Sequence, residues 1–192
     1  YQNYLTAVSE LSRLGYKRIG TVLNKKFVLG TRMGTKWYTG YLEHQSSVAT
    51  ENLIPVLAHE NPPPGAKFSK KEDRLRFTEF KAWFQKWRPD AVLTLAGNEK
   101  RWIDSMKLKI PADVGLACLV HPADSNYAGI DEKCDVLGST ALDLVCAQIS
   151  RNEFGLPLHA KTMTIRGCWV DGNTLKTSGQ PRTKLRIKSA SF

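Results

Sequence analysis

Apolar residues recur along the chain in two patterns, which predict two kinds of secondary structure. Spacings of three and four residues are typical of amphipathic helices, whereas short apolar runs bounded by turn residues are typical of buried strands. Helical spacing predicts helices over residues 4–14, 31–44, 71–87, 98–106 and 131–152, the last being the longest. Apolar runs predict strands over 19–23, 53–57, 91–95 and 114–119, and alternation predicts another over 161–165.

The helical spacing also predicts which side chains face the core. The inward-facing set is Leu5, Val8, Leu11 and Leu14; Trp37, Tyr41 and Leu42; Leu75, Phe77, Phe80, Trp83, Phe84 and Trp87; and Leu137, Ala141, Leu144, Val145 and Ile149.

Glycine and proline residues separate these elements. Gly15 and Pro89 are expected to end helices, and the Pro-rich segment 61–65 is expected to be a loop. Pro55 favours an edge position for the strand that contains it. Helices that alternate with short apolar strands predict an α/β fold, a parallel sheet flanked by helices on both faces.

The charge of the chain is strongly positive but unevenly distributed. With 28 Lys and Arg against 18 Asp and Glu, the net charge is +10, which could indicate nucleic-acid binding. Half of that excess lies in residues 173–192, where there is no acidic residue, so we expect a basic, solvated C-terminal tail after a domain of residues 1–172. The five cations of this tail are Lys176, Arg182, Lys184, Arg186 and Lys188.

Sequence motifs for cofactor or metal chemistry are absent. The four cysteines lack a C-x-x-C spacing, so no zinc site is expected; Cys118 and Cys146 lie in apolar stretches and are expected in the core as reduced thiols. No phosphate loop, G-x-G-x-x-G, G-x-S-x-G or H-E-x-x-H motif is present. The sequence therefore predicts neither a metal, a cofactor nor a catalytic residue, and no run of 18 apolar residues predicts a membrane span.

Several short motifs occur in an order and at separations that are more specific than any one of them. They are Leu14-Gly-Tyr-Lys-Arg-Ile-Gly, Trp37-x-x-Gly-Tyr, Pro89-Asp-Ala-Val, Asn98-Glu, Ile110-Pro-Ala-Asp-Val-Gly-Leu, Leu137-Gly-x-x-Ala and Gly155-Leu-Pro. Over residues 4–170 this series resembles the effector-binding domain of the LacI/GalR family of bacterial transcription regulators.

The resemblance implies a periplasmic-binding-protein-like (type I) fold and a role. This chain would hold mostly the C-terminal of two α/β subdomains, and the N-terminal subdomain and the helix-turn-helix are expected to be largely missing from it. A small-molecule, sugar-like effector bound between the subdomains would modulate operator binding by a cytoplasmic homodimer, and the chain would not be an enzyme.

Five residues are candidates for this half of the ligand pocket. The family's effector-binding arginine aligns with Trp37, which leaves Arg32 as the nearest substitute, and its acidic sugar-binding segment aligns with residues ending at His121. Asn98 and Glu99 follow a predicted strand at the edge where α/β folds bind ligands. Each has a structural alternative: a solvated charge for Arg32, core packing for Trp37, helix capping for Asn98 and Glu99, and a loop position for His121.

Two other functions remain open from the sequence. A periplasmic-type solute-binding protein for transport has the same architecture, and an upstream helix-turn-helix would distinguish the two. An α/β enzyme, such as a sugar isomerase or a nucleotide-dependent transferase, would need a phosphate loop or a paired acid and base.

Overall fold

The computed structural model describes residues 1–25, 32–60, 69–155, 159 and 162–177 of the 192-residue chain, without the side chains of residues 32–34. Six strands form one sheet in the order β2-β1-β3-β4-β5-β6; neighbours are parallel except for the antiparallel pair β5 and β6. The strands are β1 (Ile19–Asn24), β2 (Leu57–His59), β3 (Ala91–Thr94), β4 (Gly115–Cys118), β5 (Ala128–Asp131) and β6 (Cys168–Val170). The helices are α1 (Gln2–Arg13), α3 (Arg32–Ser47), the 3-10 turn η1 (Thr50–Asn52), α4 (Lys70–Trp87), α5 (Lys100–Ser105) and α6 (Cys134–Ser150).

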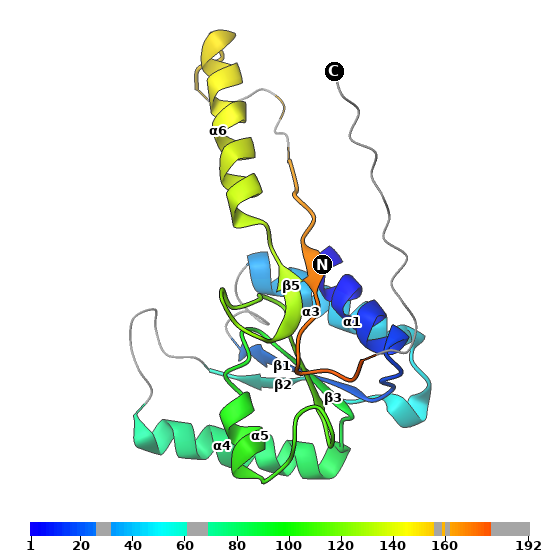
Figure 1. Ribbon diagram of the computed structural model, residues 1–192. Coiled ribbons are helices and arrows are strands. Elements are labelled where there is room, and N and C mark those ends of the chain that lie inside the picture. The colour runs from blue at the N-terminus through cyan, green and yellow to red at the C-terminus, as the bar shows by residue number, and fades with distance from the viewer. Residues whose placement is uncertain (26–31, 61–68, 156–158, 160–161, 178–192) are drawn as a thin grey trace.

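The predicted α/β architecture is confirmed, because helices cover both faces of a mostly parallel sheet. Every residue of β1, β3 and β4 is buried, as expected for strands between two helical layers. Figure 1 shows α1 and α3 on one face and α4 and α5 on the other.

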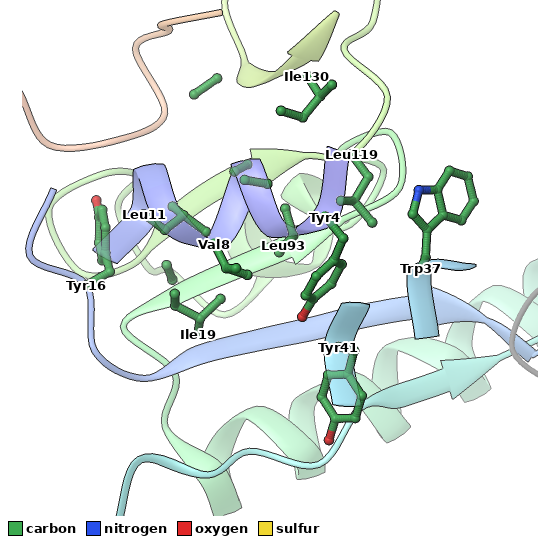
Figure 2. Packing of buried hydrophobic residues seen from close by; sticks show 14 of the residues in the cluster. Tyr4, Val8, Leu11, Tyr16, Ile19, Trp37, Tyr41, Leu93, Leu119 and Ile130 are labelled. Atoms are coloured by element: carbon green, nitrogen blue, oxygen red, sulfur yellow. The ribbon is translucent and has the colours of Figure 1, made fainter. Parts of the chain in front are cut away.

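The core under α1 and α3 is built around aromatic side chains (Figure 2). Tyr4, fully buried, exchanges a hydrogen bond of 2.8 Å with Thr21 on β1. On α3, Gly40 lies so close to this ring that a Cβ atom there would stand 3.0 Å from Tyr4 Cβ. The absence of a side chain at position 40 therefore allows α1 and α3 to approach closely.

The second core lies under α4 and α5. Phe80 and Trp83 of α4 pack with Trp102 of α5 over the buried strands. The Trp83 ring lies directly over Gly20 of β1, where a Cβ atom would come within 2.4 Å of the indole. Trp83 Nε1 donates a 2.7 Å hydrogen bond to the Pro55 carbonyl, which satisfies the polar end of the ring.

The inward faces of the helices differ in part from the sequence prediction. In α1 the buried residues include Tyr4 and Ala7, whereas Leu5 and Leu14 are only half-buried. Leu42 and Leu75, predicted to face the core, are 50% and 57% exposed. Apolar residues at the margin of a helical stripe face solvent when aromatic neighbours already fill the interface.

Two strand predictions need correction, and one strand was not predicted. The strand expected over 53–57 begins only at Leu57, although β2 does lie at the sheet edge. No strand covers the described residues 162–165; the chain returns to the sheet as β6 at Cys168. The sequence pattern did not reveal β5, whose four residues form a parallel pair with β4. The loop predicted over 61–65 lies outside the described residues.

Helix α6 stands apart from the rest of the molecule (Figure 1). None of its 17 residues is buried, and it is one residue shorter than α4, contrary to the prediction that it is the longest helix. Cys146, expected in the core, is therefore exposed. The predicted apolar stripe exists but faces solvent: Leu137, Leu144, Val145 and Ile149 are 38–58% exposed.

The segment after β6 packs against the body of the protein as far as the described residues extend. Leu175 is 5% exposed, and Thr174 accepts a hydrogen bond from Leu116 N through its carbonyl oxygen. Most of the predicted basic tail, residues 178–192, lies outside the described residues, so its extent stays a prediction. None of the described helices has the length and hydropathy needed to cross a membrane.

Candidate ligand site at the carboxyl end of the sheet

Buried polar side chains gather at the carboxyl ends of the parallel strands. Six polar or charged side chains are buried in the described part of the chain, and four of them lie here: Asn24, His59, Thr94 and Glu99. Asn24 and His59 are paired across β1 and β2, and Thr94 ends β3. In open α/β sheets, ligands bind outside the carboxyl ends of the strands, so these residues define the candidate site.

Glu99 is the most unusual member of this cluster. It begins the turn into α5, is 6% exposed, and its Oε2 atom is buried without a hydrogen-bond partner in the described structure. Burial raises the pKa of this carboxyl, while hydrogen bonds with its own backbone and with Thr94 counteract the effect. A carboxyl oxygen accepts hydrogen bonds, so the unpaired Oε2 atom of Glu99 can accept one from a hydroxyl group of a ligand.

His59 lies beside Glu99. Its Nε2 atom is 3.8 Å from Glu99 Oε1, and its ring contacts the Trp102 indole edge-on with centroids 5.6 Å apart. Burial lowers the pKa of His59 to about 4, and the positive charge of Arg76 adds to the lowering. The imidazole is therefore neutral at physiological pH, and the contact with Glu99 is a polar contact rather than an ion pair.

Thr94 connects the strand end to the following turn. Its hydroxyl accepts a 2.8 Å hydrogen bond from Gly97 N, and Gly97 has a φ of +76° that favours glycine. The Cys118 thiol lies next to Thr94, and burial raises the pKa of this thiol to about 12, which keeps it protonated. Trp102 Nε1, like Glu99 Oε2, is buried without a partner in the described structure, so the cluster offers unused hydrogen-bonding capacity.

Of the five candidates from the sequence, the structure brings Glu99 into this cluster. Asn98 is exposed beside it, at the surface of the same turn. Trp37 is 7% exposed and lies at the end of the first core near Leu119, just beyond β4 (Figure 2). Arg32 is the first residue of α3, and its side chain lies outside the described structure.

His121 is held by the neighbouring loop. Its Nε2 atom is 3.0 Å from the Tyr127 carbonyl oxygen, and its backbone N–H donates to Ile130 on β5. The ring therefore has a structural partner at the junction of β4 and β5. The ligand-binding roles of all five residues stay predictions.

His59 and Thr94 were not identified as candidates from the sequence. His59 was not predicted because the strand was expected to end at residue 57, two residues before the end of β2. A usable signal was present for two of the strands, since Asn24 and His59 directly follow the apolar residues of β1 and β2. No group of three or more potential metal ligands occurs in the described part of the chain.

No protein-family model and no curated protein matches the sequence. Solved structures do match the fold. The Lac repressor bound to ONPG in its repressed state is similar with a TM-score of 0.64 and 16% identity, over 90% of this chain and 50% of that chain. A LacI-family transcriptional regulatory protein from Corynebacterium glutamicum gives 0.62 and 14%, over 91% and 65%. CcpA of Lactococcus lactis gives 0.61 and 12%, over 91% and 62%.

These similarities establish the fold of the chain. It is the periplasmic-binding-protein-like α/β fold found in LacI-family transcription regulators, which confirms the resemblance seen in the sequence at the level of fold. The chain spans 50% of the length of the Lac repressor chain bound to ONPG and 65% of the Corynebacterium glutamicum chain.

Proposed function

We propose that this chain is the ligand-sensing domain of a LacI-type bacterial transcription regulator. A small, sugar-like molecule binds at the carboxyl end of the sheet and modulates the binding of a homodimer to operator DNA. The DNA contacts belong to a helix-turn-helix, a motif that the described residues do not form. Among the similar structures are a Lac repressor dimer bound to operator and anti-inducer, and a sugar-binding LacI-family regulator from Escherichia coli.

The observation that carries the proposal is the buried Glu99 carboxyl at the strand ends. A buried polar atom without a partner destabilises a folded protein by about 1–3 kcal/mol, so the unpaired Oε2 atom lowers the stability of this one. A ligand hydroxyl can remove that cost by exchanging a hydrogen bond with Glu99. Asn98, exposed on the same turn, supplies an amide that both donates and accepts.

The exposed face of α6 is consistent with a two-lobed sensor. In the proposed arrangement this face packs against a second α/β lobe, and the ligand lies between the two lobes. Because the ligand binds the closed arrangement better, it shifts the population of the dimer between DNA-binding geometries.

The same fold in a transport protein is the alternative function. Four cysteines without a disulfide, three of them exposed, favour a reducing compartment such as the bacterial cytoplasm over the oxidising periplasm. For this reason we propose a regulator in the cytoplasm rather than a transport protein.

The proposed site can be tested with a thermal-shift screen of sugars, sugar acids and nucleobases. The screen uses this chain and, where its gene continues beyond it, the longer product. A ligand at a hundred times its dissociation constant stabilises the folded state by about 2.7 kcal/mol. We expect a saturable shift from one class of sugar, reduced in Asn98→Ala and in Glu99→Gln.

Asn173→Ala is the matched control, because Asn173 is also exposed but follows β6, away from the strand ends that form the site. An unchanged response in both site variants would reject this location for the ligand. The absence of any shift across the screen would reject a sugar-like effector.

A further inference from the structure

A groove separate from the candidate site lies at the opposite edge of the sheet. It runs between the carboxyl ends of α4 and α5, above the amino ends of β3 and β4, and has a volume of about 900 Å³. Ligand pockets typically have volumes of 300–1,000 Å³. Along β3, this α4–α5 groove is separated from the Glu99 turn by the length of the strand, roughly 13 Å.

The lining of the α4–α5 groove is largely apolar. Phe84 from α4 and Met106 and Leu108 from the turn after α5 are half-buried and belong to the margin of the second core. Pro89, which is buried, also lines the groove. This lining provides a surface for an apolar group of a ligand.

Three cations stand around the apolar lining: Lys81, Arg88 and Lys107. All three side chains are exposed, and none takes part in an ion pair within the described structure. They come from separate elements: α4 supplies Lys81, Arg88 is its C-cap residue, and Lys107 follows α5. The groove therefore presents positive charge from several sides.

The two carboxylates in the same lining already accept hydrogen bonds from the backbone. Asp90 accepts from Lys17 N at 2.8 Å and from Arg18 N at 3.0 Å, using both of its oxygens. Asp113 accepts from Lys109 N at 2.7 Å. The cations therefore outnumber the carboxylates, whose charge is partly balanced by backbone N–H groups.

We propose that the α4–α5 groove binds an amphipathic anion, a molecule with an apolar chain or ring and one carboxylate or comparable anionic group. The apolar part lies against Phe84, Met106 and Leu108, and the anionic group lies near Lys81, Arg88 and Lys107. The positive charge of Lys81, Arg88 and Lys107 favours an anionic occupant over the cationic residues of the segment 173–192. The proposal is independent of the sugar-like effector proposed for the Glu99 site.

Decanoate is a suitable probe, with decanol as its uncharged counterpart. We expect one equivalent of decanoate to bind saturably to the full chain in a calorimetric titration. Lys81→Gln combined with Lys107→Gln should weaken binding about fivefold, the effect of two partly exposed charge contacts. Lys70→Gln combined with Lys71→Gln removes the same charge from the other end of α4 and should leave the affinity unchanged.

A diazirine derivative of decanoate locates the bound molecule. We expect cross-links on α4 and on residues 105–108. Cross-links confined to α6 would overturn the proposal, because the exposed apolar face of that helix would then be the binding surface. Equal affinities for decanoate and decanol would also overturn it.

If the same lysines had only a structural role, the double variant would give a different result. Cations near the carboxyl end of a helix offset its dipole and stabilise it without a ligand. If the double variant lowers the melting temperature but binds decanoate as tightly as the original chain, the lysines act on the helices and the groove is not an anion site.

Discussion

The candidate site contains two ionisable side chains, Glu99 and His59, whose pKa values are shifted in opposite directions by burial. Burial raises the pKa of Glu99 and lowers that of His59, because it disfavours the charged form of each. The His59 imidazole, 3.8 Å from Glu99, is therefore neutral near pH 7. A neutral imidazole beside a buried carboxyl group suits the recognition of hydroxyl-bearing molecules, because both side chains can form hydrogen bonds with hydroxyl groups.

His59 should make the protein sensitive to mild acid. Its folded-state pKa of about 4 lies below the ordinary value of 6.5, so its contribution to stability is complete above pH 6.5 and is lost as the pH falls towards 4. The difference between the two values corresponds to about 3 kcal/mol. Urea unfolding at pH 7 and pH 4.5 should show that His59→Gln loses less stability than the original chain.

The exposed His159 provides the control for this measurement. His159→Gln should lose as much stability between the two pH values as the original chain does. An equal loss in His59→Gln would mean that position 59 does not carry the acid sensitivity.

At the scale of single elements, α4 has a complete start signal. The Ser69 hydroxyl accepts a hydrogen bond from Glu72 N at 3.2 Å, and the Glu72 carboxylate accepts one from Ser69 N at 2.9 Å. This reciprocal capping box satisfies two backbone donors at the end of the helix.

Ser69→Ala should therefore destabilise the protein by about 1 kcal/mol, the usual cost of removing such a cap. Chemical unfolding followed by circular dichroism measures the change. Ser46→Ala is a matched control, since Ser46 lies near the end of α3, where its hydroxyl donates to a carbonyl of the helix and caps no amide. An equally large effect at position 46 would show that the loss at position 69 does not come from the cap.

The elements that the sequence predicted well are those with strong and continuous patterns. The strands β1, β3 and β4 are short apolar runs, a pattern typical of strands buried on both faces of a sheet. Helix α4 has many aromatic residues at helical spacing. By contrast, β5 has only four residues, Ala-Gly-Ile-Asp, and its pairing with β4 and β6 depends on residues distant in the sequence. Such short segments become strands through tertiary contacts rather than through a local pattern.

The location of the candidate site could be predicted from the sequence, but not all of the residues that form it. The rule for α/β sheets pointed to the turn at Glu99, and the structure buries Glu99 there. His59 comes from an edge strand that begins at Leu57 rather than at residue 53, so its proximity to Glu99 could not be inferred from spacing. The partners of a buried polar group depend on the register between strands, which a single sequence does not determine.

At the scale of the whole molecule, the protein consists of a packed body and a projecting helix. The body buries two cores, one on each side of the sheet, while α6 has no buried residue. On a helical wheel, the stripe of Leu137, Ala141, Leu144, Val145 and Ile149 occupies one side of α6, and Asp143 lies opposite it. An exposed apolar surface of this kind is typical of a helix with a packing partner, which is consistent with the second lobe proposed above.

Because it faces solvent, the apolar stripe of α6 should contribute little to the stability of this chain. Val145 and Ile149 are 50% and 58% exposed, so replacing both with glutamine removes few packing contacts and preserves helix propensity. We expect Val145→Gln combined with Ile149→Gln to change the free energy of unfolding by less than about 0.5 kcal/mol, as for surface substitutions. Leu11→Ala, at a fully buried position of α1, should cost about 2–5 kcal/mol in the same urea titration. A loss above about 2 kcal/mol in the α6 variant would show that this stripe is already packed in the isolated chain, because only a buried apolar side chain loses that much on replacement. The space assigned to a second lobe would then be occupied, and the two-lobed sensor would have to be abandoned.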